Sequence, residues 1–157
     1  MRVLSLASVV AFSFLLVGCP VAVWRESHFT RSKPTEADIA GTWRPTTMTL
    51  RDIRDRGHYP VATYELVLRA DHTFSMRDIP DWWGNGFGES HGHLESGDGT
   101  WDLRPATNVW QIWVVRLRFP AYETSVHLYG QRPPFLIFVR VGDPDAGGAM
   151  FFERTKA

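Results

Sequence analysis

The sequence has a single cysteine, no net charge and no nucleophile motif, and each of these features excludes a class of protein. One cysteine in 157 residues cannot form an intramolecular disulfide, so the fold must be stable through burial alone. The 17 basic residues balance the 17 acidic ones and are scattered along the chain, which argues against nucleic acid as a partner. No G-x-S-x-G motif is present, and no nucleophile is paired with a base and an orienting group, so we expect no enzyme and no cofactor.

The cysteine lies at the end of an N-terminal targeting segment. Arg2 forms a short basic region, residues 3–17 are uncharged and mostly apolar, and Gly18 is the small residue expected before a cleavage point. The run LVGC at residues 16–19 resembles the lipobox of bacterial lipoproteins. The resemblance implies cleavage before Cys19 and attachment of diacylglycerol to its thiol, and acyl chains such as palmitate then hold the domain on a membrane.

An alternative for this segment is an uncleaved signal anchor. The uncharged run continues to Trp24, and about 20 apolar residues are enough to span a bilayer. Pro20 and the Gly18-Cys19 pair favour the lipoprotein. Both interpretations place the rest of the chain in the cell envelope, on the extracytoplasmic face of a membrane.

Three parts of the chain are expected: a signal peptide at residues 1–18, a lipid-anchored tether at 19–33 and a domain at 34–157. Residues 25–33 are polar and without periodicity, which predicts a flexible spacer. Thr35, followed by Asp38, predicts the start of one short helical turn. No later segment has a convincing helical period.

The domain is rich in short β-type runs separated by glycine, proline and aspartate. They predict strands at residues 41–50, 63–69, 73–78, 99–104, 109–119, 124–129, 134–141 and 149–154. Residues 79–97 carry many glycines without alternation and predict a long loop. A flat sheet of this size would expose reactive edges, so we expect a sandwich or, preferably, a closed barrel.

Several short motifs resemble those of lipocalins and of small bacterial lipocalin-like lipoproteins. They are GTW at residues 41–43, LVLRADHTF at 66–74, GDGTW at 97–101, VGDPD at 141–145 and FER at 152–154. The resemblance implies an all-β fold: an antiparallel lipocalin-like β-barrel of about eight strands with a short N-terminal helical turn. It also implies that the tryptophans of the two GxW motifs, Trp43 and Trp101, lie in the core at strand starts. Barrels of this kind carry hydrophobic ligands, inhibit enzymes or contact partner proteins.

Two functions follow from this resemblance. The first is binding of a small hydrophobic or amphipathic ligand, and the alternative is a protein-interaction module, an inhibitor or accessory envelope protein with a filled barrel. A pocket of roughly 300 Å³ or more favours the first. Trp82, Trp83 and Phe87 in the long loop are the candidate contacts for the ligand or the partner.

The same loop contains His91 and His93, close in sequence to Glu89 and Glu95, which are residue types that bind metals. Their spacing matches no recognised metal site. We therefore expect no bound metal.

Overall fold

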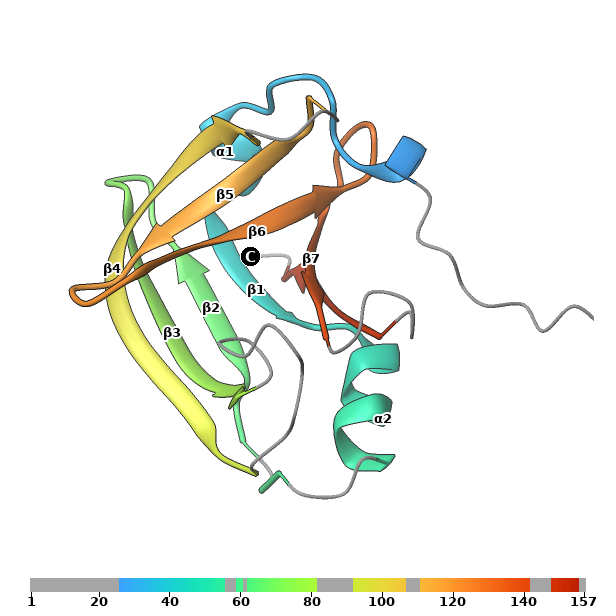
Figure 1. The fold of residues 1–157 in the computed structure, drawn as a ribbon, viewed down its shortest axis with the longest axis vertical. Coiled ribbons are helices and arrows are strands. Elements are labelled where there is room, and N and C mark those ends of the chain that lie inside the picture. Colours follow the sequence, from blue (N-terminus) through green and yellow to red (C-terminus); the bar gives the residue numbers. More distant parts are fainter. Residues whose placement is uncertain are drawn as a thin grey trace, which may run out of the picture.

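The structure, a computed structural model, describes residues 26–55, 59–60, 62–81, 92–106, 111–141 and 148–155. Eight strands form a closed barrel in which each strand pairs antiparallel with the next and β8 pairs with β1 (Figure 1). The strands are β1 (Gly41–Pro45), β2 (Glu65–Leu68), β3 (Thr73–Pro80), β4 (Leu94–Pro105), β5 (Trp113–Arg118), β6 (Glu123–Tyr129), β7 (Leu136–Arg140) and β8 (Ala149–Arg154). The helices are short: a 3-10 turn η1 (Glu26–His28), α1 (Glu36–Ile39) and α2 (Thr47–Asp55). The prediction of an all-β antiparallel barrel of about eight strands is confirmed.

Side chains fill the interior of the barrel. Alternate residues of each strand point inward because the side-chain period of a strand is two. Their buried members form one apolar cluster, which includes Trp43, Leu66, Leu68, Phe74, Met76, Trp101, Val115, Leu117, Val126, Leu128, Ile137, Val139, Met150 and Phe152. The core therefore occupies the space in which an open lipocalin-type barrel holds its ligand.

Both tryptophans of the GxW motifs are buried, as predicted, and both bond to the backbone. The Nε1–H of Trp43 donates to the carbonyl of Ile39 at 2.9 Å, and that of Trp101 donates to the carbonyl of Arg69 at 2.9 Å. Trp43 lies near the start of β1, but Trp101 lies in the middle of β4, which begins at Leu94 rather than at residue 99. The predicted position at a strand start is therefore wrong for Trp101.

The short helix after Thr35 is confirmed as α1, which begins with a complete capping box between Thr35 and Asp38. The prediction of no later helix is wrong, because β1 ends at Pro45 and residues 47–55 form α2. Proline has no N–H to continue the strand ladder. Only Thr49 and Ile53 of α2 are buried, so its apolar stripe is too narrow to give a clear helical period.

The loop expected at residues 79–97 is shorter, because β3 extends to Pro80 and β4 begins at Leu94. The pairing of β3 with β4 shifts register between Met76 and Ile79. A bulge adds a residue to one strand and interrupts the alternation of inward and outward side chains. The alternating pattern in the sequence therefore ends before β3 does.

Residues 26–30, which we call the strap, belong to the barrel. The Thr30 N–H donates to the carbonyl of Leu128 at 3.0 Å, and the Trp113 N–H donates to the carbonyl of Thr30 at 2.8 Å. Thr30 thus lies between the start of β5 and the end of β6, and it is fully buried. The prediction of a flexible spacer is wrong for these residues, because they supply hydrogen bonds that β5 and β6 do not make to each other there.

Within the described residues, no helix has the length and apolar character needed to cross a membrane.

Candidate ligand-binding groove beside α2

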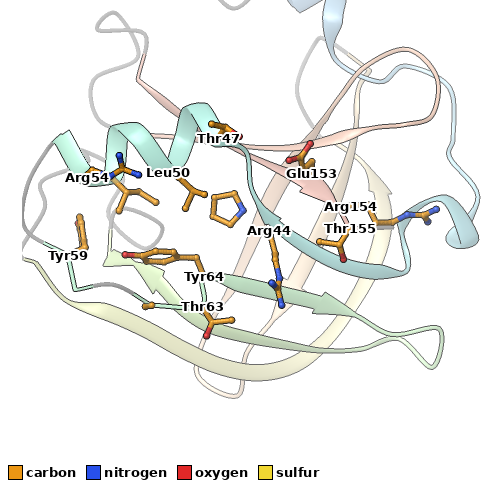
Figure 2. Close-up of a pocket in the computed structure, with 13 residues that line it drawn as sticks. Arg44, Thr47, Leu50, Arg54, Tyr59, Thr63, Tyr64, Glu153, Arg154 and Thr155 are labelled. Carbon is orange, nitrogen blue, oxygen red and sulfur yellow. The ribbon is translucent and has the colours of Figure 1, made fainter. Parts of the chain in front are cut away.

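A groove of about 760 Å³ lies between α2 and residues 59–60 and 62–64, and it is bordered by β1 and β8 (Figure 2). One wall is formed by α2 through Thr47, Leu50, Ile53 and Arg54. The facing wall consists of Tyr59, Ala62, Thr63 and Tyr64, and the strand side consists of Arg44, Pro45, Glu153, Arg154 and Thr155. The volume lies within the range of small-molecule pockets, about 300–1,000 Å³.

The groove forms where the chain leaves the sheet and returns to it. β1 pairs with β2 only as far as Trp43 and Leu66, after which the chain passes through α2. The hydroxyl of Thr49 donates to the carbonyl of Phe151 at 3.1 Å and accepts from the N–H of the same residue at 2.8 Å. α2 is therefore held beside β8, and the gap between it and the returning chain is not closed by strand pairing.

The inner part of the groove is apolar. Ile53 and Tyr64 belong to the buried core, and Ala62 and Tyr59 pack against the same core. Leu50 is 38% exposed although it is a large apolar residue, and Figure 2 shows it projecting from α2 toward Tyr64. The exposed part of its side chain is not covered by the rest of the protein, so it can contact the apolar part of a ligand.

Hydrogen bonds fix the wall opposite α2. The Tyr64 hydroxyl donates to the carbonyl of Pro60 at 2.5 Å. The Tyr59 hydroxyl donates to the carboxylate of Asp81, which is buried at the end of β3. Burial, together with the nearby charge of Asp78, raises the pKa of Tyr64, so this ring stays a neutral phenol across the physiological range. The wall is therefore held in place before any ligand binds.

The strand side of the groove is polar, and its two arginines already bond to other parts of the protein. Arg44 pairs with Glu65 at 2.8 Å. The guanidinium of Arg154 donates to the last carbonyls of α1, those of Ala37 at 2.8 Å and of Asp38 and Ala40 at 3.2 Å.

Arg54, on the α2 side, makes no ion pair or hydrogen bond through its side chain within the described part of the chain. An apolar wall beside an unpaired cation suits a molecule with an apolar body and an anionic or polar group.

Acidic side chains gather beyond the groove, at the base of the loop between β3 and β4. Burial and the negative charge of Asp81 raise the pKa of Glu95. Burial and the charge of Glu95 in turn raise the pKa of Tyr122 in the turn after β5. The Asp81 N–H donates to the carbonyl of His93 at 3.0 Å and closes the base of this loop.

The site residues predicted from sequence cannot be compared with this groove residue by residue, because they fall outside the ranges that the structure describes. Trp82, Trp83 and Phe87 lie outside the described residues, as does Cys19. The sequence pattern does not identify the groove residues, because it predicts one strand over residues 41–50. The spacing of Leu50 and Ile53, three residues apart, was the available signal of an apolar helix face.

Of the residues considered as metal ligands and set aside, Glu89 and His91 lie outside the described residues. In the ranges that the structure does describe, no three histidine, cysteine, aspartate or glutamate side chains come together as a metal site.

The sequence matches no family model, and neither a curated protein nor a solved structure matches it.

Proposed function

We propose that the chain is an extracytoplasmic lipoprotein that binds a small amphipathic molecule in the groove beside α2. The observation that carries the proposal is a preformed groove of about 760 Å³ with an apolar inner part and, at its edge, Arg54, whose side chain has no ion pair or hydrogen bond among the described residues. Pockets of this size, with mostly apolar walls and a few polar groups, are where proteins hold small ligands. The lipobox-like run ending at Cys19 supports attachment to a membrane.

The site proposed here differs from that of an open lipocalin. The barrel has the strand number and the antiparallel pairing compatible with a lipocalin-like fold. Its interior, however, is occupied by Trp43, Trp101 and the other core side chains. We therefore place the ligand outside the barrel.

The second candidate function is a protein-interaction module. The filled interior favours it, because a filled barrel acts through its surface. In this case the groove receives part of a partner protein, and no small ligand binds there with saturation.

Dye binding separates the two candidates. The dye 1-anilinonaphthalene-8-sulfonate has an apolar ring system and one anionic group, and its fluorescence rises in an apolar site. We expect saturable binding of about one dye per chain to the domain from residue 26 onward. Leu50→Glu places a charge on the apolar wall and is expected to weaken binding at least about tenfold, the equivalent of roughly 1.4 kcal/mol.

Met48→Glu is the matched control. Met48 lies on the same helix and is 53% exposed, but it does not line the groove. This variant is expected to bind the dye like the wild type. If wild type shows no saturable binding, or if both variants weaken it equally, the small-ligand function is wrong and the interaction module is favoured.

A further inference from the structure

We infer that the strap end of the barrel faces the lipid surface and that the groove beside α2 opens away from it. The inference rests on the proposed attachment of lipid to Cys19. Beyond the proposed function, it identifies the surface of the domain that faces the membrane and the side from which a ligand enters the groove.

The strap fixes the place where the chain leaves the barrel. The side-chain amide of Gln131 donates to the carbonyls of Ser27 at 2.6 Å and Phe29 at 2.7 Å. The Thr30 hydroxyl donates to the carbonyl of Gly130 at 2.6 Å, and the Gly130 N–H donates to the carbonyl of His28 at 2.7 Å. From Ser27 onward the chain therefore follows the end of β6 and the turn into β7.

Aromatic packing holds the strap against the outer face of the barrel. The ring centroid of Phe29 lies 5.1 Å from that of Phe138 and 5.6 Å from that of Tyr129, both in edge-on contacts. Phe29 is buried in a separate apolar cluster with Ile112, Phe138 and Phe151. Release of the strap would expose this cluster and break the backbone bonds of Thr30, so the exit point is a stable feature of the fold.

The chain between the lipid and the strap is short. The eight residues from Cys19 to Glu26 span at most about 29 Å when fully extended, at roughly 3.6 Å per residue. The twelve residues of β4 extend over about 40 Å at roughly 3.3 Å per residue. This segment is therefore shorter than the longest strand, so the lipid holds the strap end closer to the bilayer than the opposite end.

The groove lies toward the other end of the barrel. β6 runs antiparallel to β1, so β6 ends at the end of the barrel where β1 begins, and α1 precedes β1 there. α2 follows the last residue of β1, Pro45. Figure 1 shows η1 and α2 near opposite ends of the long axis.

The strap end has exposed cations that suit anionic headgroups. Arg31 and Lys33 follow the strap, and Arg132 lies in the turn after β6, all three exposed. Two acidic residues of α1 also lie at this end: Glu36 lies 3.4 Å from His72, and Asp38 accepts from Thr35 in the capping box. Basic residues close to a bilayer are attracted to anionic lipids.

The test uses the full chain, purified after processing in cells and reconstituted into phosphatidylcholine vesicles containing phosphatidylglycerol. Lipid on Cys19 blocks its thiol, so an introduced cysteine is the only one that a maleimide fluorophore labels. Ser32→Cys places the fluorophore beside the strap, and Met48→Cys places it on α2; both positions are exposed. A rhodamine-labelled lipid accepts energy from the fluorophore.

We expect energy transfer to lipid to be at least about twofold stronger from position 32 than from position 48. Phe29→Ser loosens the strap and is expected to reduce this difference. Tyr122→Ser, which changes an exposed aromatic residue far along the chain from the strap, is expected to keep it. Equal transfer from the two positions, or stronger transfer from position 48, overturns the orientation even when the chain floats with the vesicles.

Failure of the anchor is a separate outcome. If the chain without an introduced cysteine takes up maleimide at Cys19 and does not float with vesicles, the lipid attachment itself is refuted, and the orientation falls with it.

Discussion

Replacement of Trp43 by alanine is the strongest stability test of the barrel core. Trp43 is fully buried, and its Nε1–H donates to the carbonyl of Ile39 at 2.9 Å. A buried tryptophan removes about 150–250 Å² from water, which corresponds to roughly 4–6 kcal/mol at about 25 cal/mol per Å². Large-to-small changes at such sites cost about 3–5 kcal/mol, and we expect Trp43→Ala and Trp101→Ala each to lower the free energy of unfolding by this amount.

Urea unfolding, followed by far-UV circular dichroism, measures the effect. The domain must begin at residue 26, because a start at residue 33 would remove Thr30 from between β5 and β6. The expected loss is a large part of the 5–15 kcal/mol typical of a small protein. Met48→Ala, at an exposed position on α2, is the control and should stay within about 0.5 kcal/mol of wild type. Unchanged midpoints for both tryptophan variants would refute their assignment as core residues.

Three further changes test other parts of the molecule. A Cβ at Gly99 would lie 2.0 Å from the carbonyl oxygen of Arg118, so Gly99→Ala should cost about 1–3 kcal/mol or more in the same urea assay, and a neutral result would contradict the close approach of β4 and β5. Burial, and then the Arg140 cation, lower the pKa of His127, so the unfolded chain binds this proton more tightly. The wild type therefore keeps its full free energy of unfolding above the pKa of histidine in the unfolded chain, about 6.5. It loses part of that free energy as the pH falls from there toward the lower pKa of His127 in the folded chain. His127→Leu should therefore lose less free energy of unfolding than wild type between pH 7.5 and pH 5, and equal losses would contradict the shift. Cys19→Ser should abolish incorporation of a clickable palmitate analogue and leave the domain folded, whereas a wild-type chain that takes up no label and keeps residues 1–18 would favour the uncleaved signal anchor.

The barrel was predictable because its strands obey the simplest pattern. Tyr64, Leu66 and Leu68 alternate with more exposed residues, and all three point into the core. Such alternation depends only on the strand backbone and on which face of the strand meets water. It can therefore be recognised in the sequence without knowing which strands pair with each other. The capping box of α1 is equally local, since Thr35 and Asp38 are three residues apart.

The features that were missed depend on contacts between distant residues. α2 is held largely by Thr49, whose hydroxyl bonds to Phe151 at the other end of the chain. The strap is held in place because Thr30 makes backbone hydrogen bonds to Trp113 and Leu128, which do not bond to each other. Neither contact leaves a periodic trace in the sequence.

The groove was missed for the same reason. It forms where α2, residues 59–60 and 62–64, β1 and β8 meet, so its walls come from segments that are far apart in the sequence. The polar sequence of α2 and the β-branched threonines at its start also hid the helix between two strands.

The location of the ligand is the central claim, and amide NMR spectra of the domain from residue 26 onward test it most directly. During titration with 1-anilinonaphthalene-8-sulfonate, we predict that the largest saturating shifts occur at Thr47, Leu50 and Thr63, which line the groove. Leu117 and Ile137, whose side chains fill the interior, should change little. Shifts centred on Leu117 and Ile137, or no saturating shifts at all, would contradict binding in the groove.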